Sequence, residues 1–443
     1  MSYLEPNQAR GSAPTSYELA LAAELESAYA SGAYELDALA AALNGGGVRP
    51  PTGADWTVET LVAELARLGG EDTRPHWRLD PGPGGGLTAL DSVDALLAHG
   101  LRDQWYGLCP STAVRTGELV RLYRAGETLL LWRDASGEVH VQRDRCPHRS
   151  APLSKGVHLG DRVACNYHGV QIDGTGTVVS VPGSPGCALE GRAAVTTFPS
   201  CERAGAIFAW ITESGAEPAP LELPEQLSSD DWESFLCYVE WDAPYQWAMD
   251  NVMDPMHGAF LHRESHSMST GKREAVFQIR DAATGFVFEK TDQKSVNFDW
   301  VEWIDNGFQA MRLDIPYGDS AGPGGPFAIV AMLTPSGADK HVAFVWRCRR
   351  VSGWQRDSWR FLYRVVLEDR HWKVLEQDRA MIEAMPPDAV AGEGLYQHDI
   401  ALVRVRRLLR RRAEQYLRDR EKTQGRATPV TGRAQHREMA VSE

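Results

Sequence analysis

Two short cysteine–histidine motifs place the strongest constraint on how this chain can fold. The first reads Cys146-Pro-His148 and the second reads Cys165-Asn-Tyr-His168, with sixteen residues between His148 and Cys165. Together they offer two thiolates and two imidazoles from two loops. A metal centre that uses all four donors has to hold both loops side by side.

Two kinds of centre accept this donor set. Zinc would bind it tetrahedrally, and a [2Fe–2S] centre would bind it with the cysteines on one iron and the histidines on the other. The spacing favours the cluster, because Cys-x-His puts both donors on one short turn and the second loop repeats the arrangement. Zinc fingers usually pair like donors two to four residues apart. Strand patterns at residues 128–133 and 138–143 predict a β-hairpin leading into the first loop.

A second motif follows about ninety residues later, Asn251-Val-Met-Asp254-Pro-Met-His257-Gly-Ala-Phe-Leu-His262. Two imidazoles and one carboxylate from elsewhere form the facial triad that binds Fe(II) and leaves positions open for oxygen. Five positions on a helix are about 140° apart, so we expect the helix to bend or tighten between His257 and His262. Taken alone, the pair is equally consistent with two histidines that fall close together by chance, with Asp254 as a capping or solvated acid.

Length and charge limit the remaining classes. The chain has 443 residues, enough for two or three domains, and a net charge of −14, which disfavours general binding to nucleic acid or anionic membrane. The first residues lack a basic and an apolar region, and apolar runs such as 204–211 are short, so we expect no signal peptide and no membrane span. Seven cysteines form an odd set in a large chain and indicate a reducing, cytoplasmic location.

The first hundred residues predict a small helical module. Helices are expected at 17–30, 36–43 and 58–68, followed by a flexible linker at Pro81–Gly86. Such a module could bind DNA, but residues 44–69 contain two arginines against three acids, a poor phosphate-binding surface. A packing or subunit-contact module is the better interpretation.

The flanks of both motifs resemble a known family. Pro-His-Arg149, Ala151-Pro-Leu153 and Tyr167-His-Gly169, followed by Asn-x2-Asp-x2-His-x4-His, resemble the alpha subunits of Rieske non-haem iron aromatic-ring-hydroxylating oxygenases, in the phthalate and vanillate branch, over residues 103–412. Ser150 stands where the family usually has glycine, and Val170 where it often has tryptophan. The resemblance implies an α+β fold. A helical N-terminal extension (1–102) precedes a Rieske β domain (103–215) and a catalytic domain (216–443) built on a helix-flanked antiparallel β-sheet.

The family implies roles for named residues. The four cluster ligands are Cys146, His148, Cys165 and His168. His257 and His262 bind the mononuclear iron with a later aspartate, for which Asp378 is the best match and Asp369 and Glu376 are competitors. Asp254 hydrogen-bonds His257 and the partner subunit's His168 within a homotrimer, which provides an electron path. Asn251 lies near the iron without ligating it.

The resemblance also implies a reaction. A terminal oxygenase takes electrons that originate from NAD(P)H through a separate reductase, with or without a ferredoxin, and uses O2 at Fe(II) to hydroxylate an aromatic substrate. O- or N-demethylation by the same centre is the alternative, and a Rieske electron carrier without oxygenase activity is the rival. A carboxylated substrate would need a buried cation, for which Arg312 and Arg347 are candidates.

Five smaller features of the sequence also carry expectations. Cys187 and Cys201 are expected to be structural thiols, and His266 a satisfied polar residue. The arginine-rich helix at Arg404–Arg412 is expected to be solvated or to face another subunit. The tail after Arg420 is expected to be loosely ordered. Large apolar residues at 297–311 line either a pocket or plain core.

Overall fold

The computed structural model describes residues 8–70, 77, 79–82, 88–265, 274–296 and 298–426. Most of the expected linker (residues 83–86), His266, Asn297 and residues 427–443 lie outside these ranges. In the described part of the chain, no helix combines the length and the apolar character needed to cross a membrane.

Three small antiparallel sheets carry the cysteine–histidine loops. Their strand orders are β1-β10-β9, β2-β3-β4 and β5-β6-β7-β8. The strands are β1 (Gln104–Pro110), β2 (Leu119–Arg124), β3 (Glu127–Arg133), β4 (Val139–Arg143), β5 (Val157–His158), β6 (Arg162–Ala164), β7 (Gln171–Asp173), β8 (Val178–Ser180), β9 (Ser200–Arg203) and β10 (Ala206–Ile211). The β3–β4 pair is the hairpin that the sequence predicts, whereas β1 lies earlier than the first expected strand.

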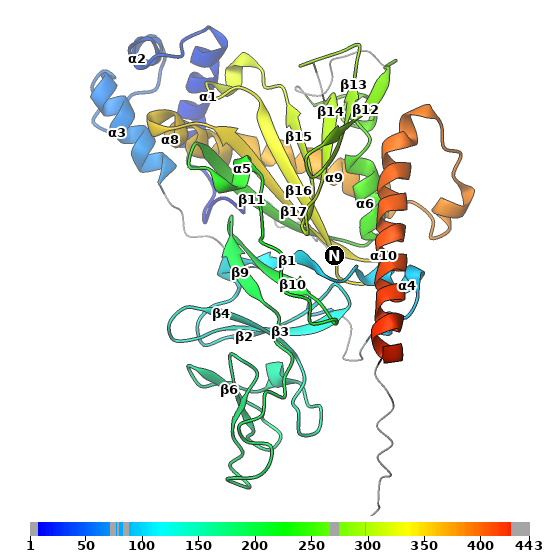
Figure 1. Ribbon diagram of the computed structural model, residues 1–443. Helices are drawn as coiled ribbons and strands as arrows, with labels where there is room; N and C mark the ends of the chain where they lie inside the picture. Colours follow the sequence, from blue (N-terminus) through cyan, green and yellow to red (C-terminus); the bar gives the residue numbers. More distant parts are fainter. Residues whose placement is uncertain are drawn as a thin grey trace, which may run out of the picture.

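A seven-stranded antiparallel sheet forms the centre of the molecule (Figure 1), in the order β11-β17-β16-β15-β14-β13-β12. Its strands are β11 (Trp232–Trp241), β12 (Phe277–Ala282), β13 (Gly285–Lys290), β14 (Trp300–Asp305), β15 (Gln309–Ile315), β16 (Phe327–Pro335) and β17 (His341–Arg350). The antiparallel register is continuous from β11 to β12.

The central sheet is covered on both faces, which explains the nearly unbroken apolar sequence of β17. Alternate residues point to opposite faces of a strand. Val345 packs in the core shared with the helices, whereas Phe344 and Trp346 pack in the core shared with β1 and β10. A methyl group on Gly107 of β1 would come within 3.0 Å of the Phe344 ring, so the two sheets touch closely.

Helices cover the face of the sheet opposite β1 and β10. The α-helices are α1 (Ser16–Ala30), α2 (Leu36–Gly45), α3 (Val58–Gly69), α4 (Val93–His99), α5 (Glu225–Ser228), α6 (Tyr245–Val252), α7 (His257–Leu261), α8 (Gly353–Leu362), α9 (Glu368–Glu383) and α10 (Ile400–Arg426). A π-helix, η4 (Tyr363–Leu367), joins α8 to α9. Short 3₁₀ turns occur at η1 (Ser111–Ala113), η2 (Leu153–Lys155), η3 (Asp319–Ala321), η5 (Ala389–Gly392) and η6 (Gln397–Asp399). The predicted α+β class, with N-terminal helices before a β domain and a helix-flanked sheet, is confirmed.

The N-terminal helices α1–α3 pack beside α8 (Figure 1). A methyl group on Gly69 would lie 2.6 Å from the Asp357 carbonyl oxygen, so α3 and α8 meet backbone to backbone. The Tyr29 hydroxyl lies 2.8 Å from the Ser358 hydroxyl. The N-terminal module therefore belongs to the helical layer of the large sheet.

Helix α10 corrects two sequence-based expectations. Four of its arginines form ion pairs within the chain: Arg404 with Asp281, Arg406 with Asp250 and Glu393, Arg410 with Asp94, and Arg412 with Asp305. The prediction that Arg404–Arg412 is solvated or faces another subunit is wrong for Arg406 and Arg412, which pair with partly buried acids, whereas Arg404 and Arg410 form their pairs at the exposed surface. The prediction that the chain is loosely ordered after Arg420 is also wrong for residues 421–426, because the helix continues to Arg426.

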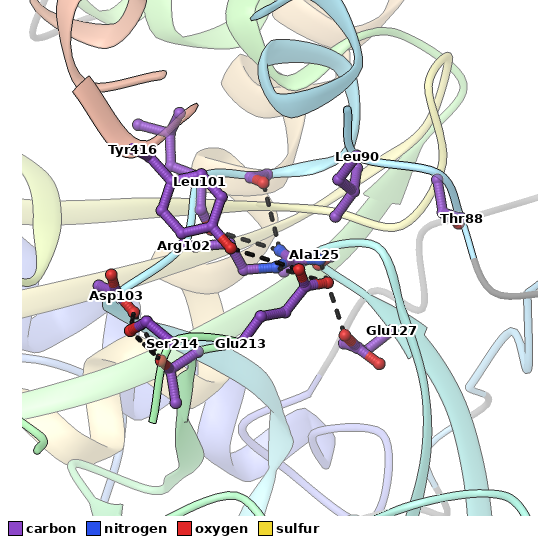
Figure 2. Close-up of polar contacts among 12 residues, drawn as sticks. Thr88, Leu90, Leu101, Arg102, Asp103, Ala125, Glu127, Glu213, Ser214 and Tyr416 are labelled. Atoms are coloured by element: carbon purple, nitrogen blue, oxygen red, sulfur yellow. Dashed lines mark hydrogen bonds and ion pairs between the residues drawn. The ribbon is translucent and has the colours of Figure 1, made fainter. Parts of the chain in front are cut away.

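A buried arginine joins three segments at the lower end of α10. Figure 2 shows Arg102 between Leu101 and Ala125, with the carboxylates of Glu213 and Glu127 below it. Its Nη1 donates to the Ala125 carbonyl oxygen at 2.7 Å, and its other nitrogens lie 3.7 and 3.8 Å from Glu127 and Glu213. Tyr416 of α10 donates to Glu213 at 3.2 Å. Arg102 thus connects α4, the β domain and the C-terminal helix.

We expect Arg102→Gln to lower the free energy of unfolding by about 2 kcal/mol, because it removes a buried cation that bonds main-chain carbonyl groups, while Glu127 keeps its bonds to Arg143. Denaturant unfolding measures the loss. Arg418→Gln is the matched control, since Arg418 is half-exposed and should change stability by less than about 0.5 kcal/mol. Equal, small losses in both variants would contradict this role for Arg102.

Candidate metal centres

The two cysteine–histidine loops share one backbone design. In each loop the cysteine N–H donates to the carbonyl five residues later, and the cysteine carbonyl accepts the N–H four residues later. The partners are Ala151 and Ser150 for Cys146, and Val170 and Gly169 for Cys165, with all four N···O distances between 2.8 and 2.9 Å. The loops therefore present their side chains in the same geometry from two places in the sequence.

The same design explains the unusual serine of the first loop. Ser150 has a φ of 61°, and Gly169, its counterpart in the second loop, has a φ of 72°. This left-handed backbone costs a residue with a side chain about 1–2 kcal/mol. Ser150 therefore carries backbone strain where the family's usual glycine would carry none. Val170, the other departure, is buried in the small core behind the loops.

We expect Ser150→Gly to stabilise the β domain by about 0.5–1 kcal/mol. The glycine relieves the backbone strain, and this gain exceeds the cost of the greater conformational freedom that glycine gives the unfolded chain. Thermal unfolding followed through the visible absorption of the cluster measures it. Ala151→Gly is the control and should destabilise, because Ala151 does not have a positive φ. A lower melting temperature for Ser150→Gly would show that the serine side chain has a stabilising role of its own.

The two thiols and the two imidazoles of these loops differ in burial. Cys146 and Cys165 are both 2% exposed and lie in one core, and burial raises the pKa of the Cys146 thiol, with the neighbouring Cys165 adding to the rise. His148 and His168 are exposed, with ring centroids 4.6 Å apart. Thiols inside and imidazoles outside match a [2Fe–2S] centre that has two cysteines on one iron and two histidines on the other.

This arrangement disfavours a single zinc ion. Two ligands of one zinc lie at most about 4.6 Å apart, twice the Zn–S bond length. Among the described residues, groups of three or more donors within 4.8 Å of one another do not include any of these four residues. Cys187 and Cys201 are free thiols, and both are partly exposed.

The second motif folds into two short helices rather than one. Helix α6 ends at Val252, and α7 begins at His257 and ends at Leu261, so His262 is its C-cap. The interruption at Asp254-Pro255 and the end of α7 bring the two imidazoles to one side, with ring centroids 5.1 Å apart. The expected distortion of the helix is present, as a helix that is only five residues long.

His257, His262 and Asp378 converge on one point. The Nε2 atoms of His257 and His262 lie 3.6 and 3.2 Å from Oδ1 of Asp378, and the three residues form a potential metal site. His262 and Asp378 are buried. Burial lowers the pKa of His262, but the hydrogen bond and charge of Asp378 outweigh it, so the pKa is raised overall. Two imidazoles and a carboxylate are the donor set of non-haem Fe(II).

Neighbouring groups fix both imidazoles. Nδ1 of His257 lies 2.5 Å from the Asp254 carbonyl oxygen, and Nδ1 of His262 lies 2.9 Å from Oε1 of Gln377. With Nδ1 acting as the donor, each Nε2 keeps its lone pair for a metal. The sequence carries no signal for Gln377, because adjacent helical residues point about 100° apart, so a position next to Asp378 is not expected to face the same site.

Asn251 and Asp254 differ in how they reach the site. Nδ2 of Asn251 donates to Oδ1 of Asp378 at 3.2 Å, so Asn251 lies beside the potential ligands. Asp254 contacts His257 through its main-chain carbonyl, whereas its carboxylate Oδ1 accepts the Met256 N–H at 2.8 Å. The expected carboxylate bond to His257 is therefore made by the backbone instead, because Asp254 is used to turn the chain before α7.

The competing acids point elsewhere. Asp369 pairs with Lys373 at 2.8 Å and is exposed, and Glu376 pairs with Arg379. On helix α9, only Asp378 belongs to the potential metal site.

An apolar pocket adjoins this site. Its lining residues come mainly from α9 and the strands β15–β17, and they include Ser265, three residues after His262. Its apolar lining residues are Ile315, Phe327, Ile329, Val345, Val374 and Leu375. Val374 precedes Asp378 by one helical turn, so the pocket and the carboxylate share one face of α9. Phe298 and Trp303 are not among its lining residues: Phe298 lies edge-on to His257, with ring centroids 5.7 Å apart, and Trp303 is buried in the core.

Two sequence families match this chain in the order in which the two centres occur. Residues 104–199 match the Rieske [2Fe-2S] domain, and residues 241–415 match the vanillate O-demethylase oxygenase C-terminal domain. The chain is therefore similar to the oxygenase subunits of Rieske systems in both of these parts. The cofactors of this family are a Rieske [2Fe–2S] cluster and a mononuclear iron.

Individual relatives agree with the family. The oxygenase component of chloroacetanilide N-alkylformylase from Rhizorhabdus wittichii is 34% identical over 165 residues, which cover 37% of this chain and 47% of that protein. The vanillate O-demethylase oxygenase subunit of a Pseudomonas species is 28% identical over 167 residues, 37% of this chain and 46% of that protein. The chain thus spans about half the length of the curated relatives it matches. The terminal oxygenase of carbazole 1,9a-dioxygenase from Novosphingobium sp. KA1 shares the fold, with a TM-score of 0.61 and 20% identity over 74% of this chain and 96% of that one.

The N-terminal module matches a third family. Residues 1–70 match the recombinase-like helix-turn-helix domain. In helix-turn-helix proteins the second helix of the motif lies in the major groove of DNA. Here α3 packs its apolar face inward and its C-terminal end against α8. The exposed Arg67 of α3 donates two hydrogen bonds to Glu64 at 2.7 and 2.9 Å. Its positive charge is therefore already paired, which makes the solvent-facing side of α3 a poor binding surface for DNA phosphates.

Proposed function

We propose that this chain is the terminal oxygenase component of a Rieske system, which uses O2 and electrons from a separate reductase to hydroxylate an aromatic substrate. The observation that carries the proposal is the convergence of two imidazole Nε2 atoms on the Asp378 carboxylate beside an apolar pocket. When bound, iron would supply the activation of O2. The division into residues 1–102, 103–215 and 216–443 belongs to the same proposal.

The residues of the chain hold and orient the centre. We propose His257, His262 and Asp378 as its ligands. The Asp254 carbonyl and Gln377 hold the imidazole protons on Nδ1, which orients Nε2 toward the metal. Asn251 donates to Asp378 Oδ1 and so fixes the carboxylate plane. The apolar pocket excludes water from the place where substrate would lie.

Electrons would enter through the exposed side of the β domain. We propose that Cys146, His148, Cys165 and His168 hold the cluster. Tyr167 stacks on His168 at 3.9 Å, and Arg149 lies over Tyr167, which gives a reductase or ferredoxin an aromatic, cationic surface beside the cluster. Asp254 uses Oδ1 within the chain, so we propose that its Oδ2 accepts a hydrogen bond from the partner subunit's His168 in a homotrimer. Seven free cysteines support a reducing cytoplasm.

We expect Asp378→Asn and His257→Ala to abolish substrate-dependent O2 uptake and the high-spin iron–nitrosyl signal in electron paramagnetic resonance, because each removes a ligand. The signal of the reduced Rieske cluster should be unchanged in both variants. Asp369→Asn, on the same helix but paired with Lys373 at the surface, is the matched control and should keep both signals. A Rieske signal without an iron–nitrosyl signal in iron-replete wild-type protein would instead make the chain an electron carrier.

Oxidative O- or N-dealkylation is the second candidate reaction. The match of residues 241–415 to a vanillate O-demethylase domain supports it. With labelled O2, ring dihydroxylation puts both oxygen atoms into the product. Dealkylation puts one atom into the organic products, releases an aldehyde and sends the other atom to water. We expect one of these two patterns, and mass spectrometry of the products distinguishes them.

A further inference from the structure

A single side chain anchors the N-terminal segment to the edge of the central sheet. Gln8 accepts the Tyr238 N–H at 2.9 Å and donates to the Tyr238 carbonyl oxygen at 2.7 Å. Tyr238 lies on β11, an outer strand of the sheet, so the Gln8 amide takes the place that the backbone of a further strand would occupy. Gln8 is only 4% exposed, and the segment is fixed at this point.

The next two residues reach the junction between η4 and α9. The Ala9 N–H donates to Oε1 of Glu368, the first residue of α9, at 2.9 Å. Nη1 of Arg10 donates to the Arg364 carbonyl oxygen inside the π-helix at 3.0 Å. Arg364 in turn donates to the carbonyl oxygen of Gly70, the C-cap of α3. Both the π-helix and the first turn of α9 are thus bound by residues of the N-terminal module.

An ion pair from α1 adds a further contact to the first turn of α9. Both Nη atoms of Arg370 bond the Glu26 carboxylate, at 2.6 and 3.0 Å. A two-bond pair of this kind fixes direction as well as distance. The side chains are 40% exposed for Arg370 and 17% exposed for Glu26, so the pair can be changed without opening the core. Gln8, Ala9, Arg10 and Glu26 are called the N-terminal clamp below.

The position of α9 decides two features of the iron site. This helix supplies the carboxylate of Asp378 and, through Gln377, the acceptor that holds His262. Arg370 precedes Asp378 by eight residues, or about 12 Å along the helix. A rigid helix carries a rotation or a shift over that distance with little loss. A movement of α9 at the clamp therefore reaches Asp378.

The π-helix η4 makes such a movement possible. A π-turn holds about one residue more than an α-turn, and such turns are found frequently at functional sites. Closing η4 to an α-turn would rotate α9 by about 100° and turn Asp378 away from His257 and His262. The clamp contacts residue 364 within the π-helix and residues 368 and 370 after it, so it opposes this rotation.

We propose that the N-terminal clamp positions the iron site: it holds η4 in its π form and thereby keeps Asp378 within reach of the two imidazoles. This inference rests on the proposed oxygenase function. It gives a role to the N-terminal module, which lies outside the residues that match the two oxygenase families. The potential metal site consists of His257, His262 and Asp378, so the clamp reaches it only through α9.

Hydrogen–deuterium exchange tests the clamp on full-length protein that retains its Rieske cluster but has been stripped of mononuclear iron. We expect Arg10→Gln combined with Glu26→Gln to speed exchange of the amides of residues 364–378 at least tenfold, because the contacts that oppose opening of η4 are lost. Tyr29→Phe is the matched control. It removes a bond from the same helix α1 to Ser358 of α8, ahead of the π-helix, and should leave these amides unchanged.

The affinity of the mononuclear site for Fe(II), measured by competition with a chelator, provides the second readout. It should fall at least tenfold in the double variant, whereas the visible absorption of the Rieske cluster should not change. Glu26→Arg alone should also weaken Fe(II) binding, and the addition of Arg370→Glu should restore most of it, because the pair is rebuilt with its charges exchanged.

Two results would overturn the proposal. The first is a double variant with a lower melting temperature but wild-type Fe(II) affinity and wild-type exchange at residues 364–378, which would leave the clamp a purely structural role. The second is an equal loss of Fe(II) affinity in Tyr29→Phe. Wild-type protein that binds no second iron would instead refute the oxygenase function, and the exchange experiment, which needs no iron, would still decide whether the clamp holds α9.

Discussion

A single buried oxygen atom, Oδ1 of Asp378, organises the catalytic half of this protein. Two imidazoles from α7 and its C-cap and one amide from α6 approach this atom of α9, and a carboxylate in such a place is costly without a cation. The three helices are held in place by the central sheet and by each other. Helix α9 is reached through the π-helix η4, whose wider turn rotates the helical face that follows. The site thus depends on packing across the whole helical layer.

The sequence carried enough information for the class of fold and for the local structure around both motifs. The hairpin strands β3 and β4 and the helices at 16–30 and 58–69 form where the sequence pattern predicts them. These signals are strong because helix and strand propensity, capping residues and hydrophobic periodicity all act within a single helix or strand. The broken helix at Asp254-Pro255 likewise follows from proline and from the five-residue spacing of the histidines.

Contacts between distant segments could not be predicted in this way. Gln377 binds His262 from 115 positions away, and Arg102 joins Ala125 and Glu213, which no local pattern connects. Arg312 and Arg347 were equivalent candidates until the register of β15 and β17 assigned them to opposite faces of the sheet. The arginines of α10 looked like a surface because their acidic partners lie in four different parts of the chain.

The contact between α3 and α8 also has a consequence for how the chain is made. Gly69 and Asp357 touch, yet 288 positions separate them in the sequence. At the usual pace of protein synthesis, α8 leaves the ribosome roughly 15–60 s after α3. The N-terminal helices therefore emerge first but bury their apolar surface last. During that interval the nascent chain exposes a surface that chaperones recognise, and folding of the front end is completed only near the end of translation.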